Sequence, residues 1–276
     1  MKSYLKTKDY SISQEEFQLL LNEELDMLVT SPQPENLEKY YKSEAYISHT
    51  DSKKTLIDKL YQIVKRYSLK KKVSLLNSFL TSEKTLLDIG AGTGDFLVAA
   101  KKQDWKAQGI EPNSFARNKA NEKGVVLFTD LKEVANKKFD VITLWHVLEH
   151  LPDLENQIKT IVSLLKEKGT LVIAVPNFKS YDANYYGNFW AAFDVPRHLW
   201  HFSRNSIERI FANHKMQLLK TKPMLFDSFY VSLLSEKYKS GKQNFIRAFW
   251  IGLKSNIRAN RSKEYASHIY ILKKRL

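Results

Sequence analysis

The sequence predicts an α/β protein built on one doubly wound, mostly parallel, seven-stranded sheet. Short apolar runs rich in Val, Ile and Leu recur through the middle of the chain, and segments with helical spacing separate them. Strands that alternate with helices form βαβ units with right-handed crossovers. The expected strands cover residues 85–89, 107–111, 125–128, 139–145, 170–175, 216–221 and 268–273, the last of them antiparallel at the sheet edge.

Helical spacing fills the intervals between these strands. Pro152 suits the beginning of a helix and Gly169 its end. Upstream of the sheet, apolar residues recur at helical intervals within 55–80, which predicts one amphipathic helix or two. We expect residues 1–80 to form a mostly helical N-terminal extension and residues 81–276 the main domain, with a basic helical insertion at about 224–264. The other expected helices cover residues 94–102, 114–123, 153–166 and 204–213.

Composition narrows the class of protein. The chain has 276 residues, of which 43% are hydrophobic and 27% charged, as in ordinary globular proteins. It has no cysteine, which excludes disulfides, thiolate metal sites and a cysteine nucleophile and favours a reducing compartment. The N-terminus lacks the apolar core of a secretory signal, and no apolar run approaches the roughly 18 residues of a membrane span. We therefore expect a cytoplasmic protein.

The net charge of +14 is concentrated in two segments. Residues 53–72 contain eight Lys or Arg and one acid, and residues 232–276 contain eleven and two. The rest of the chain is close to neutral, so the charge is peripheral to the predicted sheet. Such flanks suit an anionic membrane or a partner. Nucleic acid is not an expected partner, because no RNA- or DNA-binding motif is present in the sequence and Lys and Arg alone give only nonspecific contact.

A glycine-rich turn follows the first predicted strand, in the stretch LLDIGAGTGDFL at residues 86–97. A strand that ends in such a turn before a helix brings the main chain close to a ligand at the carboxyl edge of the sheet. The spacing is G-x-G-x-G rather than the dinucleotide fingerprint G-x-G-x-x-G, and no Gly-Lys-Ser/Thr follows. Both departures disfavour a phosphate ligand. The alternative is a tight turn with no ligand, beside which Asp88 only caps or orders the loop.

These residues resemble class I S-adenosylmethionine-dependent methyltransferases. The family's signature loop resembles residues 88–94, and Glu111 and Asp130 match its acidic residues after the next two strands. Glu111 also lies 21 positions after Gly90, close to the ribose-binding offset of about 20. The resemblance covers about residues 81–222 and implies S-adenosyl-L-methionine as cofactor and a Rossmann-like fold. The predicted cofactor-binding residues are Asp88, Gly90, Ala91, Gly92, Gly94, Glu111, Pro112, Asp130, Leu131, Trp145 and His146.

A second motif-rich segment, NYYGNFWAAFDVPRHLWHFS at residues 184–203, lies between the predicted fifth and sixth strands. It resembles the D-x-P-R-H segment of a subset of these methyltransferases linked to small-molecule or saccharide modification. We predict His198 as general base, Asp194 as its orienter and Arg197 as an anchor for the acceptor, with His201 and His146 as further catalytic candidates. The alternative is a buried structural network in which Asp194 pairs with Arg197 and the histidines only cap or pack.

No metal site is predicted. His146, Glu149 and His150 match the H-x-x-E-H pattern of some zinc peptidases, but here the pattern leaves a strand and meets Pro152. The N-terminal leader resembles one that carries paired cysteines in many relatives, and here it has none. From that leader, Tyr46 and His49 are weaker candidates to reach the cofactor.

The family's amino-group methylases usually carry Asn or Asp, two prolines and an aromatic after the fourth strand, where this chain has WHVLEH. The sequence therefore favours methylation of a hydroxyl, or less readily a carbon, on a small molecule, a saccharide or a lipid-linked intermediate. Two alternatives stay open, a catalytically silent nucleoside-binding regulatory protein and an RNA-modifying methyltransferase.

The C-terminal flank predicts a basic amphipathic helix, because Phe245, Phe249, Leu253 and Ile257 fall four apart with Lys and Arg on another face. It either lies on an anionic membrane or packs on its own domain or a second copy. Packing is the favoured expectation, because most such stripes face a core.

Overall fold

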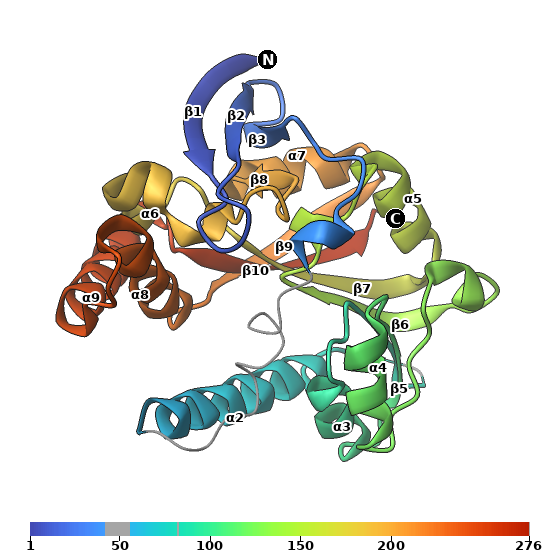
Figure 1. The fold of residues 1–276 in the computed structure, drawn as a ribbon. Helices are drawn as coiled ribbons and strands as arrows, with labels where there is room; N and C mark the ends of the chain where they lie inside the picture. The colour runs from blue at the N-terminus through green and yellow to red at the C-terminus, as the bar shows by residue number, and fades with distance from the viewer. Residues whose placement is uncertain (42–55, 82, 276) are drawn as a thin grey trace.

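The computed structural model describes residues 1–41, 56–81 and 83–275, so the candidates Tyr46 and His49 lie outside the described residues. A central sheet of six strands has the order β5-β4-β6-β7-β10-β9 (Figure 1). Its first three pairings are parallel, and β10 pairs antiparallel with both neighbours. The strands are β4 (Thr85–Ile89), β5 (Lys106–Ile110), β6 (Phe139–Trp145), β7 (Leu165–Pro176), β9 (Met216–Pro223) and β10 (Ser267–Lys274).

The predicted seventh strand at 125–128 is wrong. Among the described residues it is reduced to one parallel bridge between Ile110 and Phe128. The segment lies at the open edge of the sheet. Val126 is 75% exposed there, so burial of its side chain does not stabilise an extended strand. Two residues later, Asp130 already caps a short 3₁₀ helix, which ends the extended chain.

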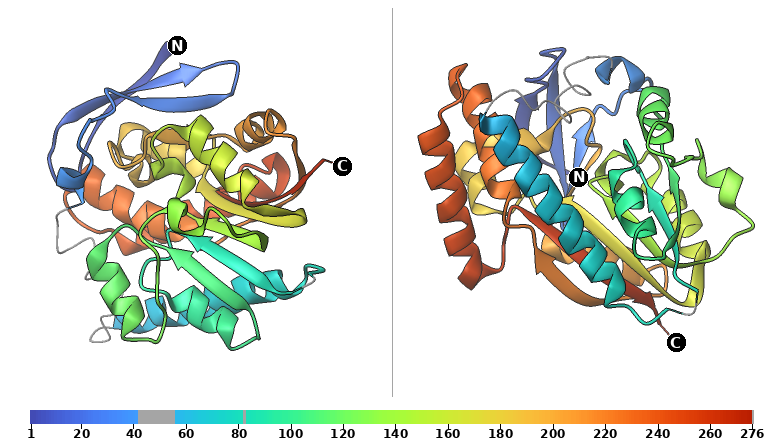
Figure 2. Two further views of the ribbon diagram at one scale, coloured as in Figure 1. Left: turned by 90° about the vertical axis from the view of Figure 1, so that its right-hand side faces the viewer. Right: turned by 90° about the horizontal axis from the view of Figure 1, so that it is seen from below.

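Helices cover both faces of the central sheet, because alternate strand residues point to opposite sides. Leu87, Ile142 and Ile173 face one core with α5 and α7, whereas Leu86, Val141 and Val172 face the other with α2 and α3. The long helix α2 crosses the lower face (Figure 2, right). These helices are α2 (Leu56–Asn77), α3 (Asp95–Lys101), α4 (Ser114–Asn121), α5 (Leu154–Ser163) and α7 (Arg204–Ala212).

The prediction that residues 1–80 are mostly helical is wrong for the first forty. They form three strands, and β8 joins them in a second, antiparallel sheet with the order β1-β2-β3-β8. Alternate residues such as Phe17, Leu19 and Leu28 are buried against the segment that follows β7. The period of two was therefore the relevant signal in EFQLLLN and MLVTS. The strands are β1 (Lys2–Lys8), β2 (Glu16–Asn22), β3 (Met27–Ser31) and β8 (Trp200–Phe202).

Two helices occupy the predicted basic insertion between β9 and β10. They pack on each other and on α6, at one side of the sheet (Figure 1). Among the described residues, every helix is too short or too polar to cross a bilayer. The helices are α6 (Tyr181–Tyr186), α8 (Asp227–Ser240) and α9 (Phe245–Ser262).

Candidate functional site

The glycine loop connects β4 to α3 at the carboxyl edge of the central sheet. Gly90 and Gly94 have φ angles of 70° and 75°, a region that residues with a side chain rarely adopt. A Cβ atom on Gly90 would lie 2.3 Å from Cγ2 of Val147, which belongs to the segment after β6. The loop therefore needs glycine at position 90 for backbone shape and for space.

Glu111, directly after β5, is the residue on which this loop closes. One carboxylate oxygen accepts the N–H of Gly92 at 2.8 Å and the other accepts that of Asn113 at 2.9 Å. Two bonds from rigid main chain fix the orientation of a side chain that is 9% exposed. The predicted pairing of an acid at this offset with the glycine loop is thus present in the structure.

Asp88, the last polar residue of β4, is buried beneath the loop. Its carboxylate accepts a hydrogen bond from the Thr143 hydroxyl at 2.6 Å, and burial raises its pKa to about 7. Lys72, on α2, lies above the neighbouring Trp145 ring, 4.2 Å from its centroid. Burial lowers the pKa of Lys72 to about 8, although Asp88 and Asp227 favour its charged form. Sequence reasoning missed Lys72, because it lies in a basic segment that was interpreted as peripheral to the predicted sheet.

The remaining predicted cofactor residues lie along the same edge. Ala91 is buried within the loop, and Pro112 is exposed after β5. Asp130 is exposed and accepts the N–H of Lys132 at 2.8 Å, and Leu131 begins the 3₁₀ helix that Asp130 caps. The contact between the Glu111 N–H and the Phe128 carbonyl, 2.9 Å, holds this segment beside Glu111. A direct role of Asp130 in ligand binding stays a prediction.

His146 follows β6 with a φ of 57° and lies between two carboxylates. Its Nδ1 is 3.5 Å from Glu149 and its Nε2 is 3.2 Å from Asp227 of α8. Burial lowers the pKa of His146, but the two carboxylates outweigh burial and raise it to about 10. A histidine that is protonated at neutral pH cannot accept a proton, so this geometry does not support His146 as a general base. Asp227 was not predicted.

Arg197 is the centre of a buried ion network. Its guanidinium donates to Asp194 and to Asp9 of the segment after β1, and the shortest distances are 2.6 and 2.9 Å. Its other acceptors are Ser11 and the carbonyl of Tyr40. The side chain is 1% exposed, and all its N–H groups have acceptors. These contacts match the structural alternative, and they leave no donor with which Arg197 could anchor an acceptor.

The predicted orientation of His198 by Asp194 is not what the structure contains. The ring Nε2 of His198 is 3.9 Å from the Asp194 carboxylate, too far for a hydrogen bond, and His198 Nδ1 instead lies 2.9 Å from the carbonyl of Ala192. His201, on β8, contacts the neighbouring strand of the N-terminal sheet, where its Nε2 is 3.0 Å from the Thr30 hydroxyl of β3. Burial holds the pKa of His201 well below its usual value. Its ring packs against Phe193 rather than at the glycine loop.

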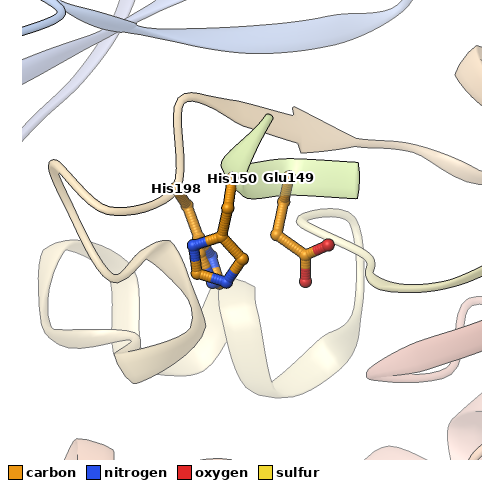
Figure 3. Close-up of side chains that lie close together, drawn as sticks. All are labelled: Glu149, His150 and His198. Atoms are coloured by element: carbon orange, nitrogen blue, oxygen red, sulfur yellow. The ribbon is translucent and has the colours of Figure 1, made fainter. Parts of the chain in front are cut away.

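The structure brings His198 next to two residues of the segment after β6. Glu149 and His150 lie in the 3₁₀ helix Leu148–His150, and the His150 and His198 rings are 4.5 Å apart (Figure 3). Tyr41 also contacts His150, with its hydroxyl 3.0 Å from Nδ1. Burial chiefly raises the pKa of Tyr41, and Asp194, Glu149 and Glu111 raise it further. Acidic groups near the glycine loop and near Arg197 thus both raise the pKa of the Tyr41 hydroxyl.

Comparison with known proteins decides the family. A profile described as a methyltransferase domain matches residues 60–220, more than half of the chain. The chain belongs to the methyltransferase family. A ubiquinone biosynthesis O-methyltransferase of Histophilus somni (strain 2336) is 34% identical over 112 residues, 35% of this chain and 46% of that protein. Its counterpart in Coxiella burnetii (strain RSA 493 / Nine Mile phase I) is 28% identical over 36% of this chain and 47% of its own length.

Solved structures agree on the fold of this methyltransferase. Magnesium protoporphyrin IX methyltransferase from Synechocystis PCC 6803, solved with bound SAH, has a TM-score of 0.54 at 14% identity and covers 82% of this chain and 90% of its own. A SAM-dependent methyltransferase from Archaeoglobus fulgidus has a TM-score of 0.50 at 18% identity, with coverages of 76% and 94%. The Rossmann-like α/β fold is thereby confirmed, whereas the match to the curated relatives spans about half of their length.

Proposed function

We propose that this methyltransferase transfers the methyl group of S-adenosyl-L-methionine to a hydroxyl oxygen of a small molecule, a saccharide or a lipid-linked intermediate. The observation that carries the proposal is the closure of the glycine loop on Glu111 through the Gly92 N–H. The O-methyltransferase names of the curated relatives support oxygen as the acceptor atom.

The residues at the loop fit a cationic sulfur nucleoside. Glu111 has lone pairs beyond its two backbone bonds, which suit the two ribose hydroxyls. Asp88 offers a carboxyl group to the ammonium of the methionyl part, and Lys72 offers a cation to its carboxylate. No glycine-rich phosphate cradle with a Lys at its end is present in this loop. Bound here, the cofactor supplies an activated methyl group, so the protein needs mainly to position the acceptor.

We assign the removal of the acceptor proton to the cluster of Glu149, His150 and His198. His198 retains the predicted role in this proposal, with the Ala192 carbonyl in place of Asp194 as its orienter. His150 is a new member, and burial together with His198 lowers its pKa to about 4, so it is neutral at pH 7. We propose in addition that the chain belongs to the D-x-P-R-H subset of the family and that a hydroxyl of a saccharide is a candidate acceptor.

The test is calorimetry followed by methyl transfer. S-adenosylhomocysteine should bind and NAD should not, and labelled methyl should pass from the cofactor to a component of fractionated lysate that mass spectrometry identifies. His198→Asn should abolish transfer while leaving S-adenosylhomocysteine affinity within about twofold. Tight NAD binding would contradict the proposal. Binding without transfer to any fraction would favour the silent regulatory protein, and loss of acceptor activity after nuclease treatment would favour the RNA-modifying alternative.

A further inference from the structure

Glu149 carries a buried carboxyl group that lacks hydrogen-bond partners within the described part of the chain. Its side chain is fully buried, and neither oxygen has a hydrogen-bond partner among residues 1–41, 56–81 and 83–275. A buried carboxyl group without hydrogen bonds is costly, so native proteins rarely leave one without a compensating group. The ion pair with His146, at 3.5 Å, compensates only one of the two oxygens.

Two histidines beside Glu149 are held in a tautomer that suits metal binding. His150 Nδ1 lies 3.0 Å from the carbonyl of Arg197, and His198 Nδ1 lies 2.9 Å from that of Ala192. A carbonyl can only accept, so each Nδ1 carries the proton and each Nε2 keeps its lone pair; the Tyr41 hydroxyl then accepts from the same Nδ1 of His150. Backbone carbonyls fix metal-ligating histidines in this way in many metal sites.

We propose that Glu149, His150 and His198 bind one divalent transition-metal ion of the zinc type. One ligand atom from each of the three lies within 4.8 Å of the others. Tetrahedral zinc holds its ligand atoms roughly 3.4 Å apart, so small side-chain rotations complete the geometry. Figure 3 shows the three side chains descending from two neighbouring segments into the same space. Two histidines and one carboxylate form a familiar zinc set that leaves a fourth position open.

This set differs from the H-x-x-E-H pattern that the sequence contains. His146, the first residue of that pattern, is held by Asp227 at 3.2 Å and is not a ligand here. His198 comes instead from the distant segment before β8, a contact that no spacing in the sequence could indicate. The expectation of no metal site concerned the H-x-x-E-H pattern alone. It did not consider Glu149, His150 and His198 together.

The consequence for catalysis rests on the proposed function. An oxygen bound at the open position would have its pKa lowered by the cation, as metal-bound water does. With the ion bound, the acceptor hydroxyl would lose its proton to solvent near neutral pH. His150 and His198 would then act as ligands, so the cation would replace His198 as the group that promotes loss of the acceptor proton. The cation would also neutralise the Glu149 charge.

The test uses the full chain after dialysis against a chelator, titrated with ZnCl₂ by calorimetry. Binding at one ion per chain is expected, with affinity at least tenfold weaker in Glu149→Gln and in His198→Asn. His214→Asn is the matched control, because His214 pairs with Glu155 outside the cluster, and it should bind as wild type. Absence of binding, or equal loss in the control, would overturn the proposal.

Two further measurements keep the result clear. X-ray absorption of the zinc-loaded wild type should show two imidazoles and one or two oxygens, which decides the matter should a variant fail to fold. Titration with S-adenosylhomocysteine runs in parallel. If the nucleoside binds and zinc does not, the metal proposal fails alone; if the nucleoside does not bind, the proposed function fails.

A second surface carries an independent inference. Helix α9 buries small residues such as Ala248, Gly252 and Ser255 against its neighbours and turns its large apolar residues outward. The stripe therefore does not pack on its own domain, which was one half of the favoured expectation; the other half, packing on a second copy, stays a prediction. The exposed fractions are 46% for Phe245, 75% for Ile246, 52% for Phe249, 61% for Trp250 and 58% for Ile257.

We infer that α9 docks on an anionic membrane surface. The helix contains no acid, and Arg247, Lys254, Arg258 and Arg261 accompany the exposed apolar residues. Aromatic and aliphatic side chains with flanking cations match the apolar boundary and negative charge of such a surface. A second copy of the chain would carry the same positive charge, so it is the weaker match.

Vesicle sedimentation tests this surface. The protein should bind vesicles of 30% phosphatidylglycerol in phosphatidylcholine and not vesicles of phosphatidylcholine alone. The pair Ile246→Ser and Trp250→Ser should lower bound protein at least fivefold, whereas Val126→Ser, at a 75% exposed apolar residue on the sheet edge, should not. Equal binding by the pair variant would overturn the inference. So would a concentration-dependent dimer that the pair variant abolishes, because that result assigns the surface to a second copy.

Discussion

The glycine-loop region and the Arg197 region lie near each other but are built in opposite ways. The first joins residues that are close along the chain, such as Gly92 and Glu111, 19 positions apart. The second joins Arg197 to Asp9, 188 positions away. The first leaves an acid, Asp88, with its pKa raised by burial, whereas the second satisfies every N–H of a buried arginine. In the glycine-loop region the buried Asp88 carboxyl group has a raised pKa, and a cationic ligand would stabilise its charge. In the Arg197 region the ion pairs attach the N-terminal segment to the rest of the protein.

Removal of the arginine should have the largest effect. Arg197→Leu leaves the buried Asp9 and the half-buried Asp194 without their cation, which typically costs about 3–5 kcal/mol of unfolding free energy. Denaturant unfolding measures the loss. Lys119→Leu, which breaks an exposed pair with Glu122, is the control and should change stability little. A loss below about 1 kcal/mol would show that the network does not support the fold.

The same difference explains what the sequence could predict. Strand 139–145 was predicted with the bounds that the structure has, and the loop with its acid followed from local spacing. The strands at 16–22 and 27–31 were not predicted, because they are short and their alternate apolar residues are buried only against the distant segment that follows β7. The partnership of Arg197 with Asp9, and of His198 with Glu149, depends on how distant segments pack, which no local pattern encodes.

Asp88→Asn should act in the opposite direction to Arg197→Leu. An acid whose pKa is raised from its ordinary value to about 7 contributes stability below about pH 4 that is lost as pH rises through 7. Three pH units correspond to about 4 kcal/mol. Without cofactor, Asp88→Asn should therefore be more stable than wild type at pH 8 by up to about that amount, and equal at pH 4. Unfolding curves across this range check it, and a constant difference would contradict it.

Gly90→Ala tests the shape of the loop against a matched neighbour. Both Gly90 and Gly92 have positive φ, 70° and 53°, but only a Cβ on Gly90 would meet Val147. Gly92→Ala should cost about 1 kcal/mol for its backbone, and Gly90→Ala about 2–3 kcal/mol for backbone and overlap. Val147→Ala in the Gly90→Ala background should recover part of the difference. Equal costs at the two positions would show that the contact with Val147 is not tight in solution.

The smallest expected change lies in cofactor affinity rather than in stability. Glu111→Gln keeps an oxygen for one of the two backbone N–H groups but turns an amide N–H₂ toward the other, at Gly92 or Asn113. The loop loses one of the bonds that fix it, and the ribose loses its charged acceptor, so S-adenosylhomocysteine should bind about 10- to 100-fold more weakly by calorimetry. Glu122→Gln changes an exposed acid at the end of α4, and this variant should bind S-adenosylhomocysteine as tightly as wild type. The described hydrogen bonds of the Glu111 side chain go to Gly92 and Asn113 and not to the Arg197 network, so the free energy of unfolding should stay within about 1 kcal/mol of the wild-type value. A variant that lost stability but kept affinity would reverse the roles assigned to the two regions.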